Sequence, residues 1–285
     1  MASKKQTLWE PYQHDFWKNK WDNSEYTMQD KINGDKWVSV KCSPMLPYVL
    51  KYTPKNARIL EAGCGMGQWV IYLADLGYNI IGLDFVESTV KKIQSLHPDL
   101  QFLVGDVTDF QFDNKSFDAI LSWGVVEHFI SGPGKALKEA YRILTKEGIL
   151  FVTVPCKNHL SLLFSPLLYM KGILAKNKFI RKLRGKEPFD EMFFEYRFTR
   201  SQFRKHLSSE GFRIRETIPI CHEAGFAKVV NDLLRHGKES KIFHKNKVGK
   251  WDGLTNVGNK LCRFLNRISP WMTPDHVLFV SVKKL

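Results

Sequence analysis

The sequence lacks several features that would place it in particular classes of protein. Its 285 residues include only five cysteines, which are widely scattered, and none forms a Cys-x-x-Cys pair. The sequence therefore predicts neither a zinc site nor a disulfide framework, and reduced thiols are the simplest interpretation. No apolar run reaches the roughly 18 residues needed to cross a bilayer, and residues 1–6 lead into a polar, Trp-rich stretch instead of an apolar signal core. We therefore expect a cytoplasmic protein.

Acidic residues are scarce in the second half of the chain. Residues 1–156 contain 17 Lys or Arg and 18 Asp or Glu, whereas residues 157–285 contain 26 and 11. The whole excess of the net charge of +14 therefore lies in the second half. This asymmetry indicates that the second half faces something acidic: a membrane, a nucleic acid or an anionic substrate.

Short apolar runs alternate with amphipathic stretches between about residues 57 and 155. Each run is rich in Ile, Leu, Val or Phe and is bounded by Gly, Asp, Asn or Pro, as buried parallel strands tend to be. The runs are Ala57–Glu61, Asn79–Asp84, Leu100–Val104, Asp118–Ser122 and Gly148–Val154, and the helical stretches are Gln68–Leu76, Ser88–Ser95 and Lys135–Leu144. The alternation predicts an α/β fold, a doubly wound parallel sheet with helices on both faces.

The regular alternation stops after Pro155 and returns only in parts. We expect an N-terminal helical extension over residues 1–56 and one domain over residues 57–285, with insertions at about 156–195 and 221–275. The pattern predicts a helix over Thr199–Glu210, strands over Phe212–Ile220 and His276–Val282, and helical stretches near Phe226–Arg235 and Leu254–Ile268.

Three glycines follow the first predicted strand, at Gly63, Gly65 and Gly67. Glycine lets the backbone turn tightly and approach a ligand closely, and the helix that follows presents free N–H groups at its start. A dinucleotide site would require Gly-x-Gly-x-x-Gly/Ala. The sixth position is Gln68 counted from Gly63 and Val70 counted from Gly65, so a pyrophosphate site is disfavoured. The absence of Gly-Lys-Ser/Thr likewise excludes a P-loop.

Two carboxylates follow the next two strands. Asp84 ends the second strand, where an acid can accept hydrogen bonds from both hydroxyls of a ribose. Asp106 follows the third strand and could accept a hydrogen bond from an exocyclic amine of adenine. Ionised carboxylates only accept hydrogen bonds, which suits hydroxyl and amine donors. The glycine turn with these acids predicts a site for a nucleoside.

Taken in order, these motifs resemble those of class I S-adenosyl-L-methionine-dependent methyltransferases, in the small-molecule or quinone O-methyltransferase branch. The resemblance covers about residues 57–155, 196–220 and 276–283. It rests on Glu61–Gly67, Gly82–Asp84, Gly105–Val107, Phe117–Ser122, Glu127–His128, Ala136–Leu144 with Gly148, and Tyr196–Thr199 through Glu210–Phe212. The family sheet has seven strands in the order 3-2-1-4-5-7-6 with the last strand antiparallel, and His276–Val282 would be that strand here.

The resemblance also implies which residues hold the cofactor, S-adenosyl-L-methionine. By position, Gly63, Gly65 and Gly67, with Glu61 in the same motif, line the methionine part. Asp84 holds the ribose and Phe85 packs on adenine. Asp106 and Val107 contact the adenine edge. Ser122 and Trp123 lie beside the methionine or the acceptor. Structural roles are the alternatives: Asp84 could be a helix N-cap, and Phe85 and Trp123 could equally be core residues. For Trp17, Trp21 and Trp37 we favour packing over closure on the cofactor.

His128 is the candidate catalytic residue. It follows the fourth strand on the side expected to face the acceptor, where a histidine could act as a general base near neutral pH. Some quinone O-methyltransferases bind a divalent metal through Glu-x-x-Glu-His, but Gly124 stands in place of the first acid, so we expect no metal. A structural role for His128 is the alternative. The weaker candidates, for which surface or packing roles are the default, are His159, His222, Glu223 and Tyr196.

Residues 159–186 join a Leu- and Phe-rich stretch to seven basic residues. One interpretation is an amphipathic segment that contacts an anionic membrane surface; the other, slightly favoured, is a lid packed on the core. The leading functional hypothesis is methyl transfer to a small-molecule or lipid-linked acceptor that carries an anionic group. Nucleic acid is a disfavoured partner, because no RNA-binding module is recognisable. The alternatives left open are an RNA methyltransferase and an inactive scaffold that binds S-adenosylmethionine.

Overall fold

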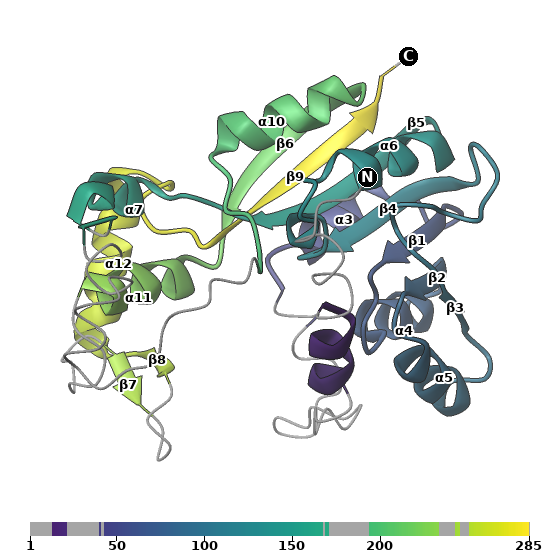
Figure 1. Cartoon of the computed structure of the whole chain (residues 1–285), viewed down its shortest axis with the longest axis horizontal. Coiled ribbons are helices and arrows are strands. Elements are labelled where there is room, and N and C mark those ends of the chain that lie inside the picture. Colours follow the sequence, from purple (N-terminus) through teal and green to yellow (C-terminus); the bar gives the residue numbers. More distant parts are fainter. Residues whose placement is uncertain are drawn as a thin grey trace, which may run out of the picture.

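The computed structural model describes residues 13–21, 40, 43–167, 169–170, 194–233, 243–245 and 251–284. Trp37 and all seven basic residues of the segment 159–186 lie outside this part of the chain. The described residues form a seven-stranded sheet and a separate two-stranded hairpin (Figure 1).

The order of the large sheet is β3-β2-β1-β4-β5-β9-β6. Its strands are β1 (Arg58–Ala62), β2 (Asn79–Asp84), β3 (Gln101–Val104), β4 (Phe117–Trp123), β5 (Leu144–Pro155), β6 (Phe212–Ile220) and β9 (His276–Lys283). Strands β1 to β5 pair in parallel, and β9 lies antiparallel between β5 and β6. The predicted order 3-2-1-4-5-7-6, with an antiparallel last strand, is confirmed.

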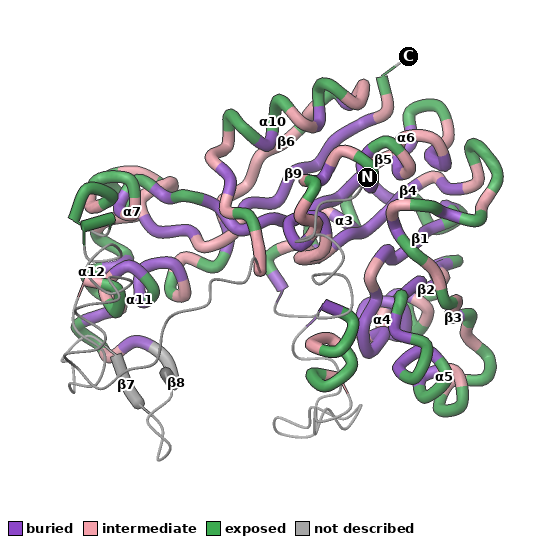
Figure 2. Tube along the Cα trace, viewed as in Figure 1, coloured by how far each residue is buried: buried purple, intermediate pink, exposed green. Residues whose placement is uncertain are grey.

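Helices cover both faces of this sheet, because successive side chains of a strand point to opposite faces. On β5, Leu150, Val152 and Val154 pack with helices α6 (Gly134–Ile143) and α10 (Arg200–Ser209). Phe151, on the opposite face, packs in the second cluster. That cluster includes α3 (Leu46–Tyr52), α4 (Gln68–Asp75) and α5 (Glu87–Leu96). The buried core therefore follows the sheet from end to end (Figure 2).

Local signals set several helix starts where the sequence predicts them. At α10 the Thr199 hydroxyl accepts from the Gln202 N–H while the Gln202 side chain accepts from the Thr199 N–H, a reciprocal cap. Helix α4 is instead preceded by Gly67, its N-cap residue, which has a left-handed φ of 69°. Glycine adopts this conformation with little strain. Because α4 follows β1 directly, its first turn lies at the carboxyl edge of the sheet.

A second, smaller lobe projects from one side of the sheet, on the left in Figure 1. It contains α7 (His159–Leu163), α11 (His222–Leu233), β7 (Phe243–Lys245), β8 (Trp251–Leu254) and α12 (Asn256–Ile268). Leu160, Phe226 and Cys262 form its small core with three other buried residues. Helix α11 begins at His222, four residues before the predicted start, and the β7–β8 hairpin was not predicted.

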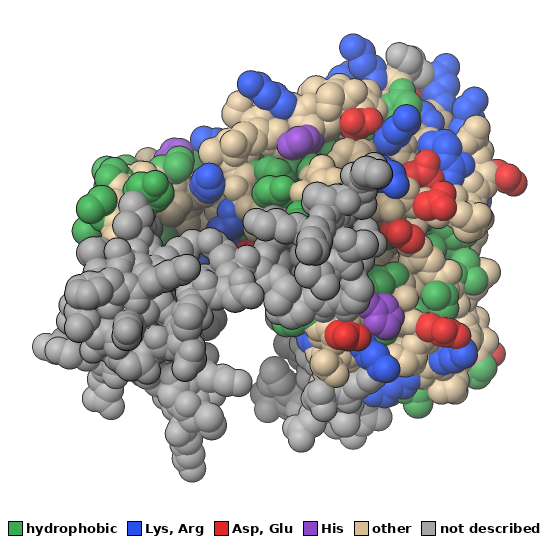
Figure 3. Space-filling view, in the orientation of Figure 1, with side chains coloured by type: hydrophobic (Ala, Val, Ile, Leu, Met, Phe, Trp, Pro, Cys, Tyr) green, Lys and Arg blue, Asp and Glu red, His purple; other side chains and the backbone are tan. Residues whose placement is uncertain are grey.

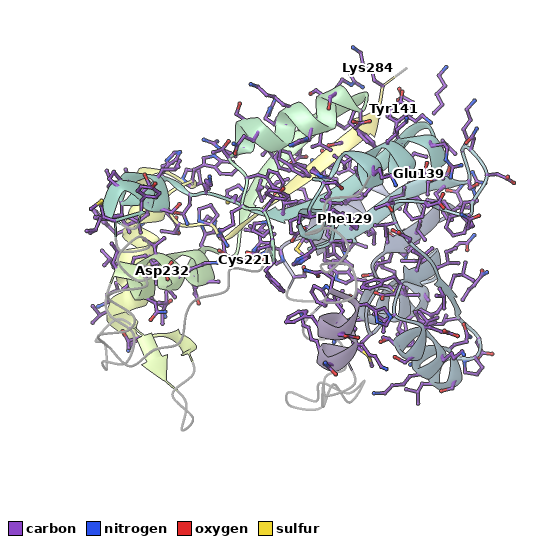
Figure 4. The ribbon with its side chains drawn as sticks, in the orientation of Figure 1. Phe129, Glu139, Tyr141, Cys221, Asp232 and Lys284 are labelled. Carbon is purple, nitrogen blue, oxygen red and sulfur yellow. The ribbon has the colours of Figure 1, made fainter. Side chains whose placement is uncertain are left out.

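Four segments of the chain connect the sheet to the lobe, and hydrogen bonds link these segments to one another. The Cys156 N–H donates to Asp275, the Asp275 N–H donates to Cys221, and Cys156 forms a bridge with Phe198. The Arg197 guanidinium pairs with the Asp275 carboxylate and donates to the Cys156 carbonyl at 3.2 Å. Figure 4 shows Cys221 at this junction. We call these residues the neck; they join the lobe to the carboxyl edge of the sheet.

A search of the described helices for a membrane span found none that is both long and apolar enough.

Candidate functional site

The glycine turn is held against the end of β2 by backbone hydrogen bonds. The N–H groups of Gly63 and Cys64 both donate to the Leu83 carbonyl, at 2.8 and 3.0 Å. Gly63 and Gly65 have φ values of 83° and 50°, which side chains tolerate poorly. A Cβ at Gly63 would lie 2.5 Å from the Val125 side chain, and one at Gly65 would lie 2.8 Å from the Trp21 ring. Both glycines are therefore required by conformation and by space.

Asp84 lies directly beside this turn, as the sequence predicts. One carboxylate oxygen accepts from the Gly65 N–H at 2.8 Å and the other from the Val86 N–H at 3.0 Å. Burial raises the pKa of Asp84, although these backbone bonds oppose the shift. Each carboxylate oxygen can accept a further hydrogen bond, so Asp84 can bind a pair of ribose hydroxyls while it holds the turn.

Glu61 supplies a second buried carboxylate at the end of β1. Its Oε2 atom is fully buried and has no hydrogen-bond partner among the described residues. Burial, with a smaller contribution from Asp84, raises the pKa of Glu61 well above its usual range. A buried carboxylate oxygen without a donor is costly, and an ammonium group would satisfy it. The methionine part of S-adenosylmethionine carries such a group, so the residues here fit that cofactor.

The residues predicted to contact adenine lie at the ends of β2 and β3. Phe85 leaves 41% of its surface exposed, so its ring is available to a ligand. Asp106 is exposed, and one of its oxygens accepts from the Thr108 N–H at 2.7 Å. Val107 is buried in the core cluster. The roles of these three residues toward adenine stay predictions.

A helical segment, residues 13–21, lies across this edge and is called the N-terminal helix here. The Trp21 ring lies against Gly65, and the Trp17 ring stacks on Trp21 with their centroids 5.8 Å apart. At one end of the helix, His14 meets the edge of Phe85 at 5.8 Å. The N-terminal helix therefore contacts both the glycine turn and the residue predicted to pack on adenine.

His128 lies on the far side of Trp17 from the glycine turn, in a short 3-10 helix, η1 (Val126–His128), after β4. Its ring is 5.1 Å from the Trp17 ring, and its Nδ1 atom is 2.8 Å from the Phe194 carbonyl. A carbonyl only accepts, so Nδ1 carries the proton and Nε2 is left to accept one. Burial lowers the pKa of His128, against the raising effect of that hydrogen bond. The neutral, base-competent form is therefore favoured at neutral pH.

Glu127, next to His128, is buried and largely protonated at neutral pH. Burial raises its pKa to about 8, and its Oε2 atom has no hydrogen-bond partner among the described residues. Its backbone carbonyl accepts from the Tyr196 N–H at 2.9 Å. The Tyr196 hydroxyl in turn donates to the Ile130 carbonyl, so the Phe194–Tyr196 segment is bound along η1.

Of the other predicted residues, Ser122 and Trp123 lie at the end of β4, and three of the weaker candidates lie in the lobe. Ser122 is buried near the end of β4, and the Trp123 ring lies 5.1 Å from Trp69. The weaker candidates His159 and His222 lie in the lobe, beside Arg200 and Thr273 respectively. Glu223 lies in the first turn of α11. Among the described residues, no group of three or more His, Cys, Asp or Glu is placed to hold a metal.

Sequence reasoning missed the segment that fixes the His128 ring. Phe194 supplies the carbonyl that selects the tautomer, and its ring also packs against Phe16 with centroids 4.9 Å apart. Gln13 donates to the same carbonyl at 3.4 Å. The only signal in the sequence was the aromatic density near residues 13–21 and 193–198, which does not reveal that the two segments meet at His128.

Comparisons with known proteins agree with this geometry. Residues 60–152 match the family model for a methyltransferase domain. A protein of Mycolicibacterium smegmatis named as a probable S-adenosylmethionine-dependent methyltransferase is 25% identical over 179 residues, which cover 63% of this chain and 60% of the relative. A demethylmenaquinone methyltransferase of Renibacterium salmoninarum is 34% identical over 96 residues, covering 33% of this chain and 40% of the relative. The chain thus spans less than two thirds of the length of these relatives.

Solved structures show the same fold. A methyltransferase from Methanosarcina mazei superposes with a TM-score of 0.52 at 16% identity, covering 84% of this chain and 98% of its own. One from Mesorhizobium loti gives a TM-score of 0.51 at 14% identity, covering 85% and 99%. The sheet order, the glycine turn with its two buried acids and the family model therefore agree: residues 60–152 match a methyltransferase domain, and the sheet has the fold of solved methyltransferases.

Proposed function

We propose that the protein transfers a methyl group from S-adenosylmethionine to a hydroxyl of a small-molecule or lipid-linked acceptor, with His128 as the general base. The observation that carries the proposal is the hydrogen bond from His128 Nδ1 to the Phe194 carbonyl, because it leaves Nε2 as the proton acceptor. The similarity to a demethylmenaquinone methyltransferase supports a small-molecule or lipid-linked acceptor, since that relative's name describes a quinone.

The chemistry asked of the protein is limited. When bound, S-adenosylmethionine supplies a methyl group on a positively charged sulfur, already activated for displacement. His128 Nε2 would take the proton of the acceptor hydroxyl, whose oxygen receives the methyl group while the sulfur–methyl bond breaks and S-adenosylhomocysteine leaves as a neutral thioether. Trp17 and Phe194 flank the His128 ring, and their apolar surfaces exclude water and align a flat acceptor. Asp84 and the glycine turn hold the cofactor in register.

The first test is cofactor binding measured by calorimetry with S-adenosylhomocysteine. We expect Asp84→Asn to weaken binding roughly ten- to hundredfold, because a hydrogen bond to a charged acceptor contributes more than one to a neutral amide. Asp99→Asn is the matched control: Asp99 is exposed and precedes β3, at the opposite edge of the sheet. Unchanged affinity in Asp84→Asn would contradict the assignment of the ribose site.

The second test is turnover on a panel of phenols and hydroquinones, followed by release of S-adenosylhomocysteine. His128→Asn keeps a donor for the Phe194 carbonyl but removes the base, so we expect kcat to fall by about a hundredfold or more. The wild-type rate should rise with pH through a pKa below 6.5, and that limb should vanish in the variant. His97→Asn is the control, since His97 ends α5 away from the site. Methyl transfer to RNA alone, or binding without turnover, would favour the alternatives of an RNA methyltransferase or an inactive scaffold.

A further inference from the structure

Helix α12 in the lobe carries an apolar stripe on its surface. Val257, Leu261, Phe264 and Ile268 are spaced by four, three and four residues and so fall within about 60° of the helix circumference. All four are exposed, and Phe264 and Ile268 leave 57% and 60% of their surfaces in solvent. The helix packs on the lobe core through a different face, which includes Gly258 and Cys262. The stripe is therefore not the face that holds α12 to the protein.

A basic stripe runs along the same helix beside the apolar one. Lys260, Arg263 and Arg267 are all exposed and fall within about 60° of the circumference, adjacent to the apolar stripe. Residues 256–268 include no Asp or Glu to neutralise them. Helix α12 thus has three faces: one packed, one apolar and exposed, and one basic and exposed. A surface helix of a monomeric protein normally has one packed apolar face, and the rest of its surface is polar.

The lobe has further exposed apolar residues around α7. The N–H groups of His159 and Leu160 donate to the carbonyls of Trp271 and Met272, so α7 begins beside the segment that follows α12. In α7 and the residues that follow it, the exposed apolar side chains are Leu162, Leu163, Leu167, Tyr169 and Met170. Tyr169 leaves 71% of its surface exposed. Figure 3 shows hydrophobic side chains gathered at this end of the molecule, where Figure 1 labels α7.

A pocket of about 650 Å³ adds positive charge near the end of α12. It is lined by Arg200, Arg204, Lys205 and Trp271, with Ser and Thr side chains between them. The Arg200 guanidinium lies 3.9 Å from the centre of the Trp271 ring. The segment that follows α12 therefore contacts, through Trp271, a second group of basic side chains, which belongs to α10.

We propose that the lobe docks on an anionic lipid bilayer, with the apolar stripe of α12 entering the interface and the basic stripe facing lipid phosphates. Apolar and cationic stripes side by side on one helix are the pattern of helices that lie in a membrane surface. Charge complementarity commits the surface to this occupant, because a nucleic acid would engage the basic stripe and leave the apolar one in water. The docking surface is independent of the methyl-transfer chemistry and would bring the protein to a lipid-linked acceptor.

The test is co-sedimentation of the full chain with vesicles of phosphatidylcholine alone and of phosphatidylcholine mixed with phosphatidylglycerol. We expect binding to the anionic vesicles that weakens as salt rises. Leu261→Gln with Phe264→Gln should abolish it, and Leu96→Gln, at an equally exposed leucine on α5 (53% exposed), should not. Neutralising Lys260, Arg263 and Arg267 to Gln should weaken binding by about a hundredfold, since each basic residue near an anionic surface contributes about fivefold.

Circular dichroism shows whether each variant is folded; the substituted side chains are exposed, so we expect unchanged melting temperatures. The proposal is overturned if the anionic vesicles are not bound, or if the α12 variants bind them as the wild type does. It is also overturned if the α12 variants only break a dimer seen by light scattering, or only lower affinity for RNA. Cofactor binding by the α12 variants should equal that of the wild type, which separates failure of this proposal from failure of the proposed function.

Discussion

At the scale of single residues, the site is built from groups that would be unfavourable elsewhere. Glu61 has a buried oxygen that receives no donor from the part of the chain described by the structure. Asp84 and Glu127 have raised pKa values because they are buried, and Gly63 and Gly65 adopt left-handed backbone. Such strained or poorly solvated groups persist where the surrounding structure enforces them, and they cluster at functional sites. Their convergence at the carboxyl edge of the sheet is the strongest residue-level argument for a ligand there.

Alanine substitutions at Gly65 and Gly77 distinguish the cost of backbone strain from the cost of a steric clash. Both have left-handed φ values, 50° and 80°, but a Cβ would meet the Trp21 ring at Gly65 and nothing within 4 Å at Gly77. We expect Gly77→Ala to destabilise the fold by about 1 kcal/mol from strain alone. Gly65→Ala should cost about 3 kcal/mol from strain and overpacking together and should weaken cofactor binding. Urea unfolding and calorimetry measure both effects; equal stability losses would contradict the contact with Trp21.

At the scale of elements, the N-terminal helix is the part of the site that comes from outside the sheet and its connecting turns. It touches the glycine turn through Trp21, Phe85 through His14 and His128 through Trp17. Lys20 lies 4.2 Å from the Trp17 ring, and burial lowers the pKa of this lysine. One short helix thus connects the predicted adenine, methionine and acceptor positions.

If the N-terminal helix closes over the cofactor, removing its contact with the turn should weaken binding. Trp21→Ala removes the apolar surface of a large, half-buried ring beside the glycine turn, so we expect about a tenfold or greater rise in the dissociation constant of S-adenosylhomocysteine. Trp271→Ala, in the lobe beside Arg200, is the control and should leave the affinity unchanged. Calorimetry on the two variants decides the matter, and an unchanged or tighter affinity in Trp21→Ala would assign the helix a packing role only.

At the scale of the whole molecule, the neck holds the lobe to the sheet. Arg197 pairs with Asp275 and Glu195, and His276 lies 3.2 Å from Asp275. Burial alone would lower the pKa of His276, but the neighbouring Asp275 carboxylate and Cys221 thiol raise it to about 9. The stabilisation from this charged His276 is therefore complete below about pH 6.5 and is lost as the pH rises through about 9.

Breaking the neck should cost more than breaking an exposed ion pair. Arg197→Gln leaves the mostly buried Asp275 carboxylate without its guanidinium partner, so we expect a loss of about 3 kcal/mol in the free energy of unfolding. Lys91→Gln removes an exposed pair with Glu87 on α5, which solvent screens, and should have little effect on the free energy of unfolding. Urea denaturation at neutral pH provides the comparison. Equal losses would mean that the neck is held by its backbone bonds and not by Arg197.

The sequence by itself determined the strands of the sheet and the cofactor edge, and its resemblance to a known family implied the strand order. Period and composition are local properties, so the boundaries of β2 and β6 match the predicted ones, and the glycine turn and Asp84 are neighbours because consecutive parallel strands end at one edge. The β7–β8 hairpin and the early start of α11 were missed, because the lobe has weak periodicity and a core of few residues.

Only the tertiary structure decided which distant segments meet at that edge. The tautomer of His128 depends on a carbonyl 66 residues away in sequence, and Trp21 lies against a turn that begins more than 40 positions later. Hydrogen bonds and ring contacts of this kind are set by how elements pack, which no local pattern encodes. The stripes of α12 show the same limit: the sequence supplies the spacing, but the packing of α11 and α12 decides which stripe is left exposed.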